Sequence, residues 1–277
     1  MKKLQFLLLS LLVFTVLFSC RGDESISKNN FPNALADTRI VTRVEEGGIP
    51  TYIYNSTPSG KLENVVLQSG STHFLSYNAA NRVQTVEVDP TSSNRSTVTL
   101  TYDASGKIAT SEKQTFMNNV LYSIEDAILT YTQGKLTNVL SKRKSSPTSP
   151  YSHYRQSDIT YNGDNIALVK ENGAMISAGI MQPMDPSFEF RYVYENHDSK
   201  INPLTTLPKE YMIALGLLGS MASSNISYNN VLKVSVFVGG NSTPVSSVSV
   251  PPLVYDAQNY PVSDTQNQLK FYYKTLQ

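Results

Sequence analysis

One eleven-residue stretch, 98–108, recurs in imperfect copies along the chain and limits what the chain can fold into. It alternates apolar and polar residues up to Tyr102, breaks between Asp103 and Gly106, and resumes the alternation at Lys107. Alternation over a short span predicts a β-strand, and the break predicts a tight turn into a second strand. The stretch therefore predicts a β-hairpin.

Seven copies of this hairpin align on one tyrosine each. The tyrosines are Tyr54, Tyr77, Tyr102, Tyr131, Tyr161, Tyr194 and Tyr255. The first six are spaced by 23 to 33 residues, a period that fits one unit of two strands, which must stack on its neighbours to bury a face. Large sheets twist and curl. We therefore predict a mainly β protein with a large antiparallel meander, open and curved, and a closed barrel as the alternative.

The copies of the motif share the backbone geometry of their turn rather than its side-chain chemistry. Asn78 stands where Asp103 does, and Asn81 stands where Gly106 does. Asp or Asn can accept a backbone hydrogen bond at the start of a turn, and Gly or Asn tolerates the left-handed conformation that closes it. We interpret the motif as an architectural unit, with Lys107 in the turn, and expect function where the repeat fails.

Three segments break the repeat, namely Lys142–Pro150, Ala174–Pro186 and Leu207–Leu218. The first is basic and proline-rich, and the second holds three methionines. The third predicts a helix capped by Thr206, with proline in its first turn and glycine after its end. It is too short to cross a bilayer. We expect it to pack on the sheet, with contact to a partner or membrane as the alternative.

The N-terminus predicts export. Two lysines precede an uncharged, mostly apolar run, 4–18, which is shorter than the roughly 20 residues of a membrane-spanning helix. The run ends at Ser19 and Cys20 in a sequence that resembles a bacterial lipobox, although Phe18 is bulkier than the usual occupant. The resemblance implies that 1–19 is a signal peptide and that Cys20 carries the lipid. An ordinary signal peptide or an uncleaved anchor is the alternative.

The residues after Cys20 are polar and aperiodic, so 20–36 is predicted to be the lipidated cysteine and a flexible tether. Residues 37–277 are predicted to form a single β-meander domain. Asp23 and Glu24 resemble the acidic signal of surface-exposed Bacteroidetes lipoproteins. Both the periplasmic and the surface-exposed side of the outer membrane stay open.

The Tyr-Asp-x-x-Gly-Lys-Ile form that begins at Tyr102, its related copies, and the strand running into Lys200 to Pro203 resemble a known group. They are similar to the tyrosine-aspartate (YD, Rhs-like) repeat lipoproteins of the Bacteroidetes, which are domains of unknown function. The likeness covers most of 50–275, but only Tyr102-Asp103 and Tyr255-Asp256 keep the pair. It implies a β-rich envelope lipoprotein and no catalytic residue.

Little in the sequence indicates chemistry. The 23 Lys and Arg balance 22 Asp and Glu, so no charge excess favours nucleic acid. Cys20 is the only cysteine and the three histidines are isolated, so we expect no metal and no cofactor. His197, Asp198 and Ser199 are the residue types of a hydrolase triad, but neighbours in one turn do not normally align for catalysis.

Two hypotheses of function follow. The first is a non-catalytic lipoprotein, joined to the outer membrane by the lipid on Cys20, with a structural role or with a tyrosine-rich sheet face that binds a glycan or a protein. The second is a glycoside-hydrolase-like or other envelope hydrolase that uses carboxylates paired across strands.

Overall fold

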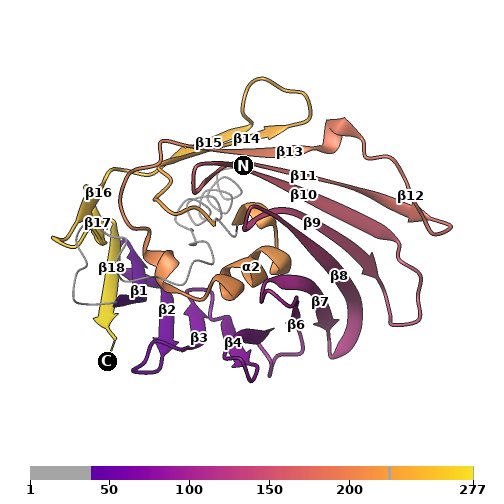
Figure 1. The fold of residues 1–277 in the computed structure, drawn as a ribbon, viewed down its shortest axis with the longest axis horizontal. Coiled ribbons are helices and arrows are strands. Elements are labelled where there is room, and N and C mark those ends of the chain that lie inside the picture. Colours follow the sequence, from indigo (N-terminus) through magenta and orange to yellow (C-terminus); the bar gives the residue numbers. More distant parts are fainter. Residues whose placement is uncertain (1–38, 224–225, 277) are drawn as a thin grey trace.

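The computed structural model describes residues 39–223 and 226–276 (Figure 1). The predicted signal peptide 1–19, Cys20 and the predicted tether up to residue 36 lie outside the described residues. Within them, eighteen strands form one sheet in which every ladder is antiparallel. The fold is mainly β, as predicted from the repeat.

The strands follow the motif copies along the chain. The first nine are β1 (Arg39–Glu46), β2 (Ile49–Ser56), β3 (Leu62–Leu67), β4 (Thr72–Tyr77), β5 (Val83–Val88), β6 (Arg95–Tyr102), β7 (Ile108–Met117), β8 (Val120–Thr132) and β9 (Lys135–Lys144). The others are β10 (His153–Asn162), β11 (Asn165–Ser177), β12 (Ile180–Met181), β13 (Phe190–Glu195), β14 (Lys233–Val238), β15 (Ser246–Ser249), β16 (Leu253–Tyr255), β17 (Pro261–Asp264) and β18 (Leu269–Thr275). The helical elements are α2 (Lys209–Leu218), η1 (Pro186–Phe188), η2 (Pro203–Thr206) and η3 (Met221–Ser223).

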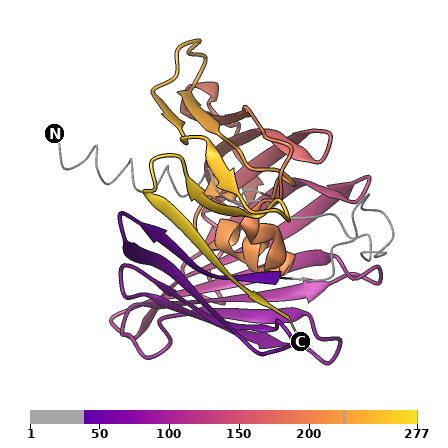
Figure 2. The same cartoon turned by 90° about the vertical axis from the view of Figure 1, so that its left-hand side faces the viewer.

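Most strands pair with the strand before them in sequence. Three strands, β13, β16 and β18, depart from this order. The short β12 pairs with the end of β11, and β13 also pairs with β11. The last strand, β18, returns to β1, which therefore lies between β2 and β18. The sheet curls until its two ends approach one another (Figures 1 and 2).

Among the described residues, no ladder joins β15 to β16, and this seam leaves the sheet open. The reason is strand direction. Each antiparallel ladder reverses the strand direction. The path through the sheet from β15, by way of β14 and β1, to β16 crosses an even number of such ladders, so β15 and β16 run toward the same end of the sheet. An antiparallel pairing is therefore closed to them, and a parallel pairing would need a crossover of about a dozen residues or more, whereas only residues 250–252 join β15 to β16. The predicted open, curved meander is confirmed, and the closed alternative is wrong.

The turns of a meander alternate between the two ends of its strands. We call the motif rim the end with the turns 57–60, 78–81, 103–106, 133–134, 163–164 and 256–259, and we call the other end the opposite rim. Arg39, where β1 begins, lies at the motif rim because it pairs with Thr275 at the end of β18. The chain thus enters and leaves the sheet on neighbouring strands.

The predicted turn geometry is confirmed. Left-handed backbone occurs at the expected positions, with φ of 59° at Asn81, 85° at Gly106 and 66° at Asn259. The residue that opens each turn accepts a hydrogen bond from the backbone N–H four positions later. The distances are 3.0 Å from Arg82 to Asn78, 2.9 Å from Lys107 to Asp103 and 3.0 Å from Tyr260 to Asp256.

The motif tyrosines join each hairpin to the previous one. The Tyr77 hydroxyl donates to the Leu62 carbonyl at 2.6 Å, and the Tyr161 hydroxyl donates to the Leu136 carbonyl at 3.0 Å. Tyr102 donates to Val83 in the same way. The basic residue after each left-handed position lies over the tyrosine ring of the next copy. These pairs are Lys61 with Tyr77, Arg82 with Tyr102, Lys107 with Tyr131 and Lys135 with Tyr161, at 4.2 to 5.6 Å.

The concave side of the sheet holds α2 (Figure 1). The helix packs against β5, β6 and β7, and Tyr211, Met212, Ile213 and Ala214 are at most 1% exposed. Packing on the sheet is confirmed, and the alternative of an exposed contact surface is wrong because the core covers the helix. Neither α2 nor any other described helix is long and apolar enough to cross a membrane.

The predicted cap is also wrong. Thr206 belongs to η2, where its hydroxyl donates to the Pro203 carbonyl at 2.6 Å and accepts from the N–H of Val41 at 3.0 Å. The helix begins after Pro208, with no side-chain cap hydrogen bond. Thr206 therefore joins the segment before the helix to β1.

Candidate functional site

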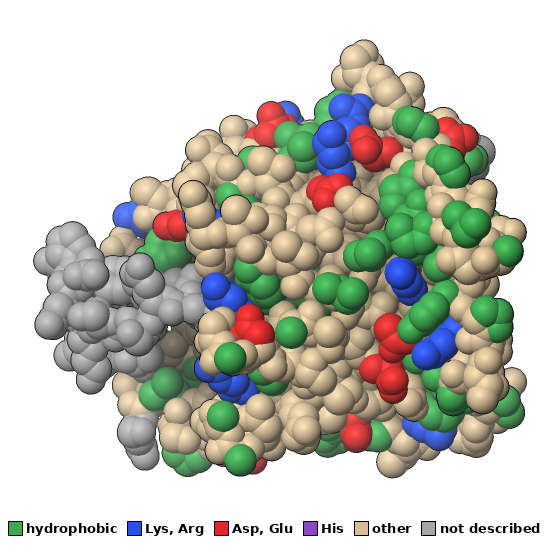
Figure 3. Space-filling model, turned by 45° about the vertical axis from the view of Figure 1, so that its right-hand side comes forward, with side chains coloured by type: hydrophobic (Ala, Val, Ile, Leu, Met, Phe, Trp, Pro, Cys, Tyr) green, Lys and Arg blue, Asp and Glu red, His purple; other side chains and the backbone are tan. Residues whose placement is uncertain are grey.

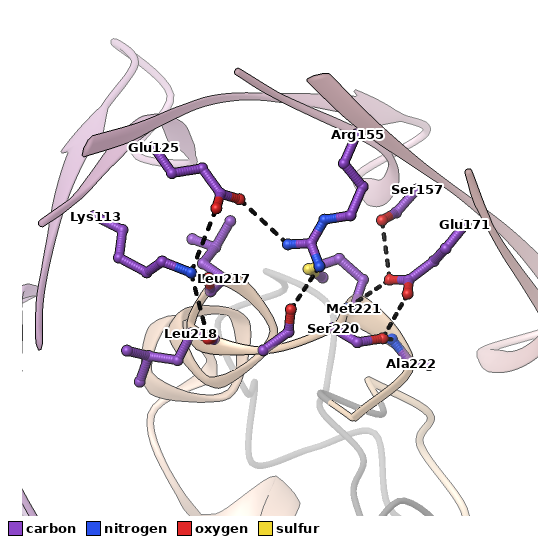
Figure 4. A network of polar contacts seen from close by, with 11 residues as sticks. Lys113, Glu125, Arg155, Ser157, Glu171, Leu217, Leu218, Ser220, Met221 and Ala222 are labelled. Atoms are coloured by element: carbon purple, nitrogen blue, oxygen red, sulfur yellow. Dashed lines mark hydrogen bonds and ion pairs between the residues drawn. The ribbon is translucent and has the colours of Figure 1, made fainter. Parts of the chain in front are cut away.

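Charged side chains from three strands meet at the end of α2 (Figure 4). Lys113 on β7 donates to the carbonyls of Leu217 at 3.0 Å and Leu218 at 3.3 Å. Arg155 on β10 donates to the carbonyl of Gly219 at 2.6 Å. The last carbonyls of a helix lack partners within it and carry partial negative charge, so cations stabilise them.

Glu125 on β8 connects these two cations. Its carboxylate lies 3.4 Å from the Lys113 ammonium and 3.3 Å from the Arg155 guanidinium. The ladder sets Lys113 and Glu125 directly opposite each other, so both face the concave side. Burial lowers the pKa of Lys113, and the charge of Glu125 opposes that shift. The carboxylate therefore offsets part of the cost of burying the ammonium.

A second inward carboxylate, Glu171 on β11, is buried and bound on both oxygens. One oxygen accepts from the Ser157 hydroxyl at 3.0 Å and from the N–H of Met221 at 2.8 Å, and the other accepts from the Ser220 hydroxyl at 2.6 Å (Figure 4). Glu171 thus fixes the start of η3 against the sheet. The carboxylates of Glu125 and Glu171 thus both bind groups of the protein.

A pocket of about 280 Å³ lies beside this network, near the opposite rim. Its lining residues are Glu125, Ser141, Arg143, His153, Tyr154 and Arg155. Three of them form one row across the sheet, since Arg143 pairs with Glu125 on one side and with His153 on the other. Residues that pair across strands share a face. The guanidinium of Arg143 also lies 5.2 Å from the ring centre of Tyr122.

Two of the three repeat-breaking segments lie at this rim. Lys142–Pro150 covers the end of β9 and the loop to β10, and it supplies Arg143. Ala174–Pro186 contains the β11–β12 hairpin, where Met175, Ile180 and Met181 are exposed. The third segment, 207–218, lies in the core as α2. Of the three, only the first contributes side chains to the pocket.

The motif tyrosines make contacts within the protein. Tyr77, Tyr102 and Tyr161 donate their hydroxyls to carbonyls, and their rings pack against the core and under basic side chains. Burial raises the pKa of Tyr77 to about 12. These rings stabilise the contacts between copies of the motif.

The turn at 197–199 is partly buried and is tied into the fold. Asp198 accepts hydrogen bonds from the Asn230 side chain at 3.0 Å, from the Lys200 N–H at 2.9 Å and from the Tyr255 hydroxyl. Its carboxylate therefore joins the turn to 230 and to β16. In the described ranges, no three His, Cys, Asp or Glu side chains come together in a way that could hold a metal ion.

The sequence patterns did not identify four residues of this network as inward-facing, namely Lys113, Glu125, Arg155 and Glu171. A signal for them exists in the sequence, because each stands at an inward position where strand alternation calls for an apolar residue. Such a position becomes visible only when the register with neighbouring strands is known. The face in Figure 3 shows acidic and basic side chains intermingled, with no broad field of one sign.

The sequence matches no protein-family model and no curated protein. One similar solved structure is a porin-like protein from Bacteroides vulgatus ATCC 8482, with a TM-score of 0.43 and 10% identity over 86% of this chain and 98% of that chain. Another is a porin-like protein from Bacteroides uniformis ATCC 8492, with a TM-score of 0.34 and 10% identity over 86% of this chain and 96% of that chain. Likeness at this level assigns neither family nor function.

Proposed function

We propose that this protein is a non-catalytic, lipid-anchored protein of the outer membrane whose β domain binds a ligand in the pocket beside Arg143. Binding rather than catalysis is favoured by one observation. The inward carboxylates of Glu125 and Glu171 already accept from cations, hydroxyls and a backbone N–H. The pocket beside them offers fixed polar groups, which is what recognition of a ligand requires.

The position of the chain entry supports the anchor. Arg39 lies at the motif rim, whereas the pocket lies near the opposite rim, next to the end of β9 and the start of β10. A tether that precedes Arg39 therefore reaches the domain at the end of the sheet away from the pocket. This arrangement leaves the pocket open to ligands while the protein is held at a membrane.

The anchor can be tested in cells that express the full chain. We expect that a clickable palmitate analogue labels the wild-type protein and that Cys20→Ala removes the label and shifts the protein out of the membrane fraction. The change Ser25→Ala, in the predicted tether, serves as the control and keeps the label. Palmitate labelling of Cys20→Ala, or an unlabelled wild type, would contradict the anchor.

Binding and catalysis can be separated with the purified lipoprotein in detergent. Oligosaccharides and envelope peptides are incubated with it, and both retention of the ligand and its cleavage products are measured. We expect retention without cleavage. Cleavage that Glu125→Gln or Glu171→Gln abolishes, without loss of the folded state by circular dichroism, would overturn the proposal in favour of a hydrolase.

A further inference from the structure

The charges that surround the pocket do not cancel. Among the described residues that line the pocket, Glu125 is the only one with a carboxylate, and its two oxygens lie against Lys113 and Arg155. Arg143 forms no ion pair with any carboxylate in the described part of the chain, and its side chain is exposed. The pocket therefore has an excess of positive charge, which attracts anions and raises their local concentration.

Arg143 also has an aromatic neighbour. Its guanidinium lies 5.2 Å from the centre of the Tyr122 ring, a cation–π contact that leaves its N–H donors available. Those donors form a planar fork that matches a carboxylate in two parallel hydrogen bonds. A guanidinium beside an aromatic ring, and without an ion pair to an acid among the described residues, is suited to bind a carboxylate from outside the protein.

The surroundings indicate what carries that carboxylate. A pocket of about 280 Å³ lies just below the usual range for small-molecule sites, about 300 to 1,000 Å³, so it holds one ring-sized group. Ser141 and His153 add a hydroxyl and an imidazole that can bond to ligand hydroxyls. Tyr122 is 53% exposed beside Arg143 and presents an apolar ring with a polar edge.

A carboxylate, several hydroxyls and an apolar ring face occur together in a uronic acid. We propose that the pocket binds a uronic acid unit of an acidic saccharide, with Arg143 pairing to its carboxylate and Tyr122 packing against the neighbouring sugar. This inference rests on the proposed binding function and names its ligand. Arg155 and Lys113 position Glu125 and the end of α2, and they need not contact the ligand.

Trigalacturonate is the probe, and its fully methyl-esterified form is the matched neutral ligand. Binding to the full-length lipoprotein in detergent is measured by isothermal titration calorimetry. We expect trigalacturonate to bind at least tenfold more tightly than its ester. We expect Arg143→Gln to weaken binding about ten- to hundredfold, as for loss of a hydrogen-bonded charge pair. Arg143→Lys should lose less, because it keeps the charge but not the fork.

Arg95→Gln is the matched control variant. Arg95 also lies over an aromatic ring, that of Phe116 at 4.2 Å, but it does not line the pocket. Its replacement should leave trigalacturonate binding unchanged, and equal weakening by Arg95→Gln and Arg143→Gln would overturn the inference. Circular dichroism and thermal unfolding show whether each variant is folded.

The remaining outcomes separate this inference from the proposed function. If a neutral saccharide binds and Arg143→Gln has no effect, the uronic acid inference is overturned and the binding function stands. If a triglutamate peptide binds and trigalacturonate does not, the uronic acid inference is overturned, because the saccharide is the wrong class of ligand, and the anion-binding function of the pocket stands. If no saccharide or peptide binds, both the inference and the binding function are overturned.

Discussion

Lys107 shows how one residue can act in two copies of the motif. Its backbone N–H donates to Asp103 and closes its own turn, while its side chain lies over Tyr131 of the next copy. The same division occurs at Arg82, whose guanidinium lies over Tyr102. A basic residue after the left-handed position therefore connects hairpins in addition to completing a turn. The tyrosine that such a basic side chain contacts lies about twenty residues later in the sequence.

Gly106 allows a direct test of this connection. A Cβ at Gly106 would lie 2.0 Å from the Arg82 guanidinium, whereas a Cβ at Gly134 meets nothing within 4 Å. Both residues have left-handed backbone, with φ of +85° and +81°. Alanine at either position costs about 1 to 2 kcal/mol of conformational energy. We expect Gly106→Ala to cost about 0.5 to 1 kcal/mol more, because it displaces Arg82 from Tyr102.

Urea unfolding of the two variants measures this difference. Gly134→Ala is the control for the strain of left-handed alanine, and subtraction of its effect leaves the contribution of the Arg82 contact. Equal losses of unfolding free energy in Gly106→Ala and Gly134→Ala would show that the contact between Arg82 and Tyr102 contributes nothing to stability.

For single residues, the sequence predicts those features that depend only on neighbours in the chain. The left-handed positions Asn81, Gly106 and Asn259 follow from the residue types of one turn. The partner of Lys107 does not follow, because it depends on how adjacent hairpins stack. Glu125 was missed for the same reason, since its two cations come from β7 and β10 and a carboxylate has no periodic signal of its own.

Among the elements, α2 was predicted within two residues, but its surroundings were not. Its composition indicates burial, and the helix is buried. Sequence alone does not show that Lys113 and Arg155 cap its C-terminus, because these residues lie on strands before the helix in sequence. Local spacing predicts that Thr206 caps the helix. In the structure its hydroxyl instead accepts a hydrogen bond from β1.

The contact between α2 and β4 makes stability depend on pH. The Nδ1 atom of His73 lies 3.0 Å from the Tyr211 hydroxyl, and burial lowers the pKa of His73 to about 4, although the charge of Asp89 opposes the shift. The unfolded chain then binds more protons than the folded one between pH 6.5 and 4. We expect the stability due to neutral His73 to be complete above pH 6.5 and to fall by up to about 3 kcal/mol toward pH 4.

Urea unfolding across this range measures the effect. His73→Gln keeps a hydrogen-bonding side chain but does not titrate, so its loss of stability between pH 6.5 and 4 should be smaller than that of the wild type. His153→Gln, at an exposed histidine, is the matched control. If His73→Gln and the wild type have the same pH dependence, burial of His73 does not contribute to the acid sensitivity.

For the whole molecule, the seam between β15 and β16 predicts where the chain can be cut. Arg39 and Thr275 face each other across the β1–β18 ladder, so a short linker can join the two ends. We expect a circular permutant of 39–276 that opens between Pro251 and Pro252 to fold with a melting temperature close to that of the unpermuted segment, because no ladder crosses this seam.

A second permutant, opened between Gln133 and Gly134, is the comparison. That cut removes the turn of the β8–β9 hairpin and makes its long ladder a pairing between distant parts of the chain. It should lower the melting temperature more than the cut at 251–252. Circular dichroism and thermal unfolding measure the melting temperatures of both permutants. A lower melting temperature for the cut at 251–252 than for the cut at 133–134 would show that the link from β15 to β16 is essential to the fold.

The place of β1 also determines how the protein carries force. A pull that is applied at Arg39 along the axis of β1 acts against the β18 ladder from Arg39 to Glu46 and the β2 ladder from Arg43 to Glu46. Such a pull loads both ladders in shear, so their hydrogen bonds bear tension together instead of opening one by one from an end. The strand next to the predicted anchor is thus the one that resists extraction of the chain from its sheet.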